Sequence, residues 1–131
     1  MMMWMLDTDS VSFALRGEGR VAEHIRSRTP SEITVSSMTA AELWFGVERR
    51  RSIRLRKLVA AFLDSVTVLP FDAQAARRYG QVGETLVRRG KPIGIVDTMI
   101  AAHALASGSV LVTHNAAHFR QVRGLRFEDW Y

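Results

Sequence analysis

The chain has 131 residues, the size of one ordinary domain, and 47% of them are hydrophobic. That fraction suits a folded protein with one core and excludes an intrinsically disordered chain. Cysteine is absent, which excludes disulfides and thiolate metal sites. The formal net charge is +5. This positive balance suits an anionic partner such as a nucleic acid without identifying one.

We expect a single domain over residues 1–131, because no composition shift, repeat or low-complexity tract divides the sequence. No run approaches the roughly 20 apolar residues that span a membrane. The apolar start is short and lacks the basic flank of a signal peptide. The sequence therefore predicts a cytoplasmic protein without a membrane partner.

The apolar residues 1–6 predict a buried strand, and they run into Thr8, Asp9 and Ser10, which are good helix N-cap residues. A helix is expected over 10–17, and a second over 20–28 stopped by Pro30. β-Branched residues then predict a strand over 32–38. The following expected elements are helices over 39–50 and 52–65, a strand over 66–71, helices over 73–89 and 95–107, a strand over 110–113 and an edge strand over 125–130.

Strands that alternate with helices predict an α/β fold with a central, mainly parallel sheet of four to five strands. Ligands of such sheets bind beyond the carboxyl ends of the strands. Asp7 follows the first expected strand, and Thr113 and Asn115 follow the fourth. Glu42 lies near the start of the helix after the second strand, and Asp97 starts the helix before the fourth. These side chains are therefore expected at one edge of the sheet.

Each acid also has a structural explanation. Asp9 could cap the first helix, but that leaves Asp7 unexplained, so we interpret Asp7 as functional and Asp9 as mainly structural. The spacing of Thr39 and Glu42 fits a capping box, which by spacing alone is the better explanation for Glu42. Asp97 stands among apolar residues, where a carboxylate needs a partner.

Three carboxylates in one cleft repel one another unless a cation lies between them. Oxygen ligands of this kind suit a hard divalent ion such as Mg²⁺ or Mn²⁺. Such an ion can polarise a phosphoryl oxygen and activate a water molecule for phosphodiester hydrolysis. An acidic pocket in a basic protein therefore indicates a metal-dependent nuclease.

Four ordered stretches carry a family resemblance: "MLDTDS", "SSMTAAELWFGVER", "GKPIGIVDTMIAAHAL" and "VLVTHNAAHF". Together they resemble the PIN-domain toxins called VapC. The resemblance implies a PIN-like three-layer α/β/α sandwich and the toxin of a type II toxin–antitoxin system. It implies a Mg²⁺-dependent endoribonuclease that cleaves structured RNA, in a tRNA or rRNA loop. It also implies a homodimer and a VapB-type antitoxin as partner.

Carried over residue by residue, the resemblance makes Asp7, Glu42 and Asp97 the catalytic, metal-binding acids. Asn115 falls at a fourth position where many PIN domains have aspartate; it carries no charge, but its carbonyl can bind a metal or orient a water molecule. Thr113 matches a family hydroxyl near the acids. Asp9 is expected to support the site without binding the metal.

Two alternatives remain from the sequence. The "DTDSV" stretch also fits a haloacid-dehalogenase-like phosphatase, with Asp7 as nucleophile. A non-catalytic RNA-binding PIN relative would explain the positive net charge but not the acids. His114 and His118 have a spacing that binds zinc on helices, yet no third ligand is near. We expect His103 to be a hydrogen-bonded packing residue.

Overall fold

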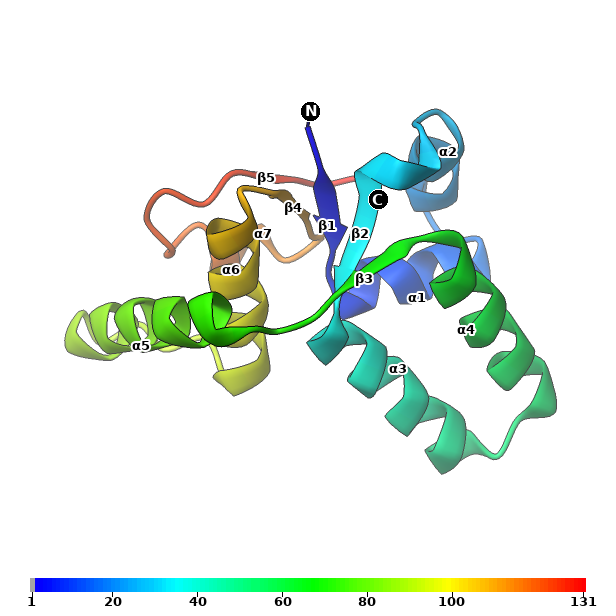
Figure 1. The fold of residues 1–131 in the computed structure, drawn as a ribbon, viewed down its shortest axis with the longest axis horizontal. Coiled ribbons are helices and arrows are strands. Elements are labelled where there is room, and N and C mark those ends of the chain that lie inside the picture. The colour runs from blue at the N-terminus through cyan, green and yellow to red at the C-terminus, as the bar shows by residue number, and fades with distance from the viewer. Residues whose placement is uncertain (1) are drawn as a thin grey trace.

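One sheet of five parallel strands runs through the middle of the molecule (Figure 1). The computed structural model describes residues 2–131 of the chain. The sheet order is β3-β2-β1-β4-β5, so β1 is central and β5 lies at an edge, as the sequence predicts. The strands are β1 Trp4–Leu6, β2 Ile33–Ser36, β3 Thr67–Leu69, β4 Val110–Val112 and β5 Phe127–Glu128.

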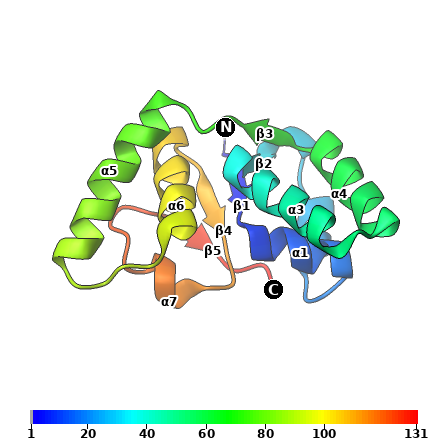
Figure 2. The ribbon, with the colours of Figure 1, turned by 90° about the horizontal axis from the view of Figure 1, so that it is seen from below.

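Helices cover both faces of this sheet (Figure 2). The first four pack on one face and the last three on the other, which gives the predicted three-layer arrangement. The helices are α1 Thr8–Arg16, α2 Val21–Arg26, α3 Ser37–Arg50, α4 Ile53–Ser65, α5 Ala73–Arg88, α6 Ile95–Ser107 and α7 Ala116–Phe119. A short 3₁₀ helix, η1 Pro30–Glu32, precedes β2.

Successive side chains along the central strands point alternately to the two faces of the sheet. Met5 and Leu111 pack in the core beneath α5, α6 and α7, whereas Leu6 and Val112 pack beneath α1–α4. Because β1 and β4 are buried on both sides, their short sequences are apolar throughout.

Two short elements, η1 and α7, were not predicted. Helices of three or four residues do not complete enough turns to show a hydrophobic period, so the sequence gives no periodic signal for them. The element α7 is separated from β4 by residues 113–115 and carries His118, whose contact is described below.

Trp130 and Tyr131 fix the residues after β5 to the body of the protein. The Trp130 side chain is only 2% exposed. The Arg28 guanidinium carbon lies 4.6 Å from the ring centroid of Trp4 and 4.3 Å from that of Trp130. Tyr131 stacks on His114 with ring centroids 4.3 Å apart. These contacts combine apolar burial with cation–π attraction.

His103 is the packing residue that the sequence predicts. Its Nδ1 lies 2.8 Å from the Ser36 hydroxyl oxygen, and Phe71 packs edge-on against its ring. Burial lowers the pKa of His103, so the neutral ring is favoured. This contact links α6 to the junction between β2 and α3, since Ser36 is the N-cap of α3.

No helix among residues 2–131 is both long and apolar enough to span a membrane.

Trp130→Ala should lower the free energy of unfolding by about 3 kcal/mol or more, because it empties a buried aromatic site. Urea unfolding followed by circular dichroism measures the change. Phe45→Ala is the control, since that ring is 68% exposed and its loss should change stability little. Equal effects of the two substitutions would contradict the assigned packing of Trp130.

Candidate active site

Asp7 lies at the carboxyl end of β1 and caps the helix that follows. Its Oδ1 accepts a hydrogen bond from the backbone N–H of Ser10, 2.9 Å away. The prediction that Asp9 caps this helix is therefore wrong: Asp9 is exposed in the first turn of α1. The helix begins at Thr8, two residues earlier than expected, because the strand-end aspartate itself has the extended backbone of an N-cap.

The Asp7 carboxyl is buried, with only 5% of the residue exposed. Burial raises its pKa, while Thr113 and Ser10 oppose the rise by hydrogen bonding to the carboxylate. Asp7 forms no ion pair with any residue in the range 2–131. A buried acid with no protein cation beside it is suited to receive a cation from solution.

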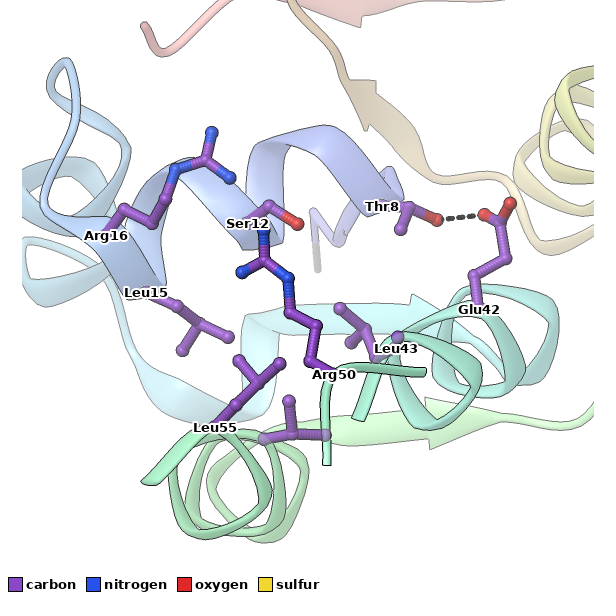
Figure 3. A pocket seen from close by; sticks show the side chains of 10 residues that line it. Thr8, Ser12, Leu15, Arg16, Glu42, Leu43, Arg50 and Leu55 are labelled. Atoms are coloured by element: carbon purple, nitrogen blue, oxygen red, sulfur yellow. Dashed lines mark hydrogen bonds between the residues drawn. The ribbon is translucent and has the colours of Figure 1, made fainter. Parts of the chain in front are cut away.

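Glu42 is not part of a capping box. Helix α3 begins at Ser37, and the Ser36 hydroxyl caps it by accepting the N–H of Met38 at 3.1 Å. Glu42 is thus the sixth residue of the helix, and its Oε1 accepts a hydrogen bond from the Thr8 hydroxyl (Figure 3). The residue is exposed. Because Glu42 does not cap α3, its observed structural role is the hydrogen bond that links α3 to α1.

Asp97 lies in the first turn of α6, as predicted, and its side chain is 34% exposed. Its Oδ2 is 3.1 Å from Nδ1 of His118, which belongs to α7. The apolar sequence neighbours of Asp97 predict a partner for this carboxylate, and His118 is that hydrogen-bond partner.

Thr113 and Asn115 follow β4, and Thr113 lies beside Asp7. The Asn115 N–H donates to the Thr113 hydroxyl oxygen at 3.0 Å. Thr113 is fully buried, and its hydroxyl also stabilises the Asp7 carboxylate. Asn115 precedes α7 but makes no side-chain capping bond, so its amide is not used to hold the helix.

The structure thus pairs the predicted residues locally instead of gathering them into one cluster. Within residues 2–131, no three histidine, aspartate or glutamate side chains lie close enough together to hold a metal ion. Glu42 is turned to Thr8 and Asp97 to His118. The donor chemistry still fits a hard divalent cation, because the acids and Asn115 can offer oxygen ligands. Asp7 is also buried and has no ion-pair partner among residues 2–131.

The sequence did not predict that Thr8 and His118 form hydrogen bonds with two of the candidate acids, Glu42 and Asp97. Thr8 stands between the two aspartates that drew attention, and its hydroxyl joins α1 to α3. His118 was considered only as a zinc ligand with His114. A signal for its role was its position just after the fourth strand, at the same sheet edge as Asp97.

A groove of about 220 Å³ lies between α1, α3 and α4 (Figure 3). Glu42 and Thr8 lie at one end of it, and Arg16 lies toward the other. Its apolar lining comes from Leu15, Leu43, Leu55 and Val59. The groove therefore joins an apolar surface directly to one of the predicted catalytic acids.

Comparison with known proteins identifies the family of this chain. The PIN domain family model matches residues 4–125. The chain is 39% identical to the tRNA(fMet)-specific endonuclease VapC of Salmonella typhimurium over 134 aligned residues, covering 99% of both chains. The chain belongs to the VapC group of the PIN-domain family.

Two further relatives agree with this assignment. The tRNA(fMet)-specific endonuclease VapC of Shigella flexneri is 35% identical and covers 99% of each chain. The crystal structure of DNA-bound VapBC from Salmonella typhimurium contains a chain that matches with a TM-score of 0.91 at 36% identity, covering 100% of both chains.

The family assignment confirms the PIN-like α/β sandwich and rejects the haloacid-dehalogenase alternative. PIN-domain VapC nucleases generally depend on a divalent metal ion, in agreement with the oxygen donors at this sheet edge. The individual roles of Asp7, Glu42, Asp97 and Asn115 stay predictions.

Asp7→Asn should stabilise the metal-free protein at neutral pH. The raised pKa means that the folded state holds a proton on Asp7 more tightly than the unfolded state does. Stability contributed by this group is therefore lost as pH rises through the folded-state pKa, while asparagine, an equally good N-cap, carries no charge.

The stability advantage of Asp7→Asn should shrink as pH falls and vanish below about pH 4, where the unfolded carboxyl is also protonated. Urea unfolding in EDTA at several pH values measures it. An advantage that is independent of pH would show that the burial of charge is not its cause.

Proposed function

We propose that this chain is the toxin of a type II toxin–antitoxin pair and acts as a metal-dependent endoribonuclease on structured RNA, in a tRNA or rRNA loop. The observation that supports it most is the similarity over 99% of the chain to a relative named for tRNA cleavage. The net charge of +5 suits a polyanionic substrate.

Mg²⁺ is the proposed metal, with Mn²⁺ as a substitute, and Asp7, Glu42 and Asp97 are its proposed ligands. Asn115 is the proposed fourth contributor, through its side-chain carbonyl. When bound, such an ion supplies Lewis-acid polarisation of the phosphate and a more acidic water molecule.

The proposed site residues differ in how rigidly the surrounding structure holds their side chains. Asp7 is fixed by its cap to α1 and by Thr113, so its position does not depend on solvent. Glu42 is exposed, and among residues 2–131 its side chain is held by a hydrogen bond from Thr8, so it can turn toward Asp7 when a cation offsets their repulsion. Asp9 is exposed beside Asp7 and adds negative charge there, which is a supporting role at most.

The proposed partners are a VapB-type antitoxin and a second copy of the chain. Several structural relatives are VapBC toxin–antitoxin complexes, such as those from Salmonella typhimurium and Rickettsia felis. We propose that the antitoxin occupies the groove between α1, α3 and α4. A segment lying there would bury the apolar lining and block Glu42 at the end of the groove.

Asp7→Asn and Asp97→Asn should each reduce RNA cleavage to the level of buffer without enzyme. Both substitutions remove a proposed metal ligand while keeping the shape of the side chain. The assay incubates antitoxin-free protein with total RNA, with Mg²⁺ or with EDTA, and maps new 5′ ends by sequencing.

Asp64→Asn is the control for these variants, because it makes the same chemical change at an exposed position of α4. Circular dichroism verifies that each variant is folded. Retained cleavage by both site variants would refute the proposed roles of Asp7 and Asp97. RNA binding without metal-dependent cleavage by the unmodified protein would favour a non-catalytic RNA-binding PIN relative.

Gly46→Gln should weaken binding of the antitoxin on the order of 10-fold or more. Gly46 lines the groove from the middle of α3, and a Cβ added there meets no atom within 4 Å, so the new side chain enters the groove and leaves the fold intact. Affinity is measured by calorimetry with purified antitoxin.

Gly80→Gln is the matched control: Gly80 is also a helical glycine, in α5, with open space around it, and it lies outside this groove. Replacing either glycine with glutamine within a helix should raise stability by about 0.5 kcal/mol. If both variants bind the antitoxin like the unmodified protein, the antitoxin lies elsewhere.

A further inference from the structure

The segment 113–118 connects two of the predicted catalytic acids. At its start, the Thr113 hydroxyl stabilises Asp7. Asn115 follows, its N–H bonded to Thr113 and its carbonyl accepting the N–H of His118 at 3.2 Å. At its end, the His118 ring reaches Asp97. One short stretch of chain therefore contacts both acids, although they are 90 positions apart in the sequence.

The contact between His118 and Asp97 has a defined direction. A carboxylate can only accept, so the imidazole Nδ1, 3.1 Å from Oδ2, carries the proton and donates it. The bond uses one of the two carboxylate oxygens, and Oδ1 is left for another ligand. Without this bond, a side chain that is 34% exposed in the first turn of a helix would be free to change rotamer.

The backbone that carries His118 is firmly anchored. The next residue, Phe119, is only 1% exposed and packs in the same core as Ile100 of α6. Helix α7 therefore cannot shift relative to the helix that carries Asp97 without opening this core. The imidazole stands on a rigid support, which is what fixing a neighbouring side chain requires.

We propose that His118 is a positioning residue, which holds the Asp97 carboxylate so that its second oxygen faces the metal site. The inference rests on the proposed function, because it assumes that Asp97 is a metal ligand. Hydrogen-bond partners of ligating carboxylates commonly change metal affinity or activity by 10- to 100-fold when they are removed. His118 itself contacts neither RNA nor metal in this proposal.

The chain offers a matched control in a second histidine–aspartate pair. Nδ1 of His114 lies 2.8 Å from Oδ2 of Asp129, and both side chains are 46% exposed. His118 has the same exposed fraction, 46%. The two pairs have the same chemistry and similar solvent access, but Asp129 is not one of the proposed metal ligands.

The test compares His118→Ala, His118→Asn, His118→Gln and His114→Ala. Asparagine places its amide N–H where the imidazole has Nδ1, whereas glutamine reaches to the position of Nε2. Binding of Mn²⁺ alone is measured by calorimetry, kcat and KM are measured for RNA cleavage in Mg²⁺, and thermal melting verifies the fold.

We expect His118→Ala to weaken Mn²⁺ binding on the order of 10-fold and to lower kcat with little change in KM. His118→Asn should restore most of both losses, and His118→Gln should not. His114→Ala should bind Mn²⁺ and cleave RNA like the unmodified protein.

Unchanged Mn²⁺ affinity in His118→Ala would overturn the proposal, and so would asparagine and glutamine variants that behave alike. Failure of the unmodified protein to bind Mn²⁺ would overturn it too. If the unmodified protein binds Mn²⁺ but cleaves no RNA, the proposed function fails, while the Mn²⁺ comparison still decides the role of His118.

Discussion

The burial of Asp7 is the constraint on which this sheet edge depends. The strand β1 is buried on both faces, so Asp7, the residue directly after it, still lies inside the protein. A carboxylate there is disfavoured by desolvation, and the structure offsets this only in part, with the helix N-terminus and two hydroxyl-bearing residues. A cation bound beside the Asp7 carboxylate would offset the remaining desolvation cost.

Parallel strands then determine what surrounds that carboxylate. Because β2, β1 and β4 all run in the same direction, the residues that follow them emerge at a single edge. Thr8 reaches across to α3, and the segment after β4 reaches α6. Glu42 and Asp97 are thus each held by a hydrogen bond from a neighbouring element.

Much of this could be predicted from the sequence, because its long periodic stretches match the observed elements. The helix over 95–107 is as expected, since it has a strong local signal. The two capping assignments failed because several polar residues adjoin each helix start, and spacing cannot decide which of them has the extended backbone. The partnership of Asp97 with His118 depends on tertiary contacts that no local pattern encodes.

The packing of residues 127–131 has a consequence for biosynthesis. The N–H of Thr113 donates to the carbonyl of Glu128 at 2.9 Å, so the segment beside Asp7 is supported by residues translated after it. A nascent chain that still holds these residues inside the ribosome lacks that support. The segment beside Asp7 therefore reaches its folded arrangement only after residues 127–131 have left the ribosome.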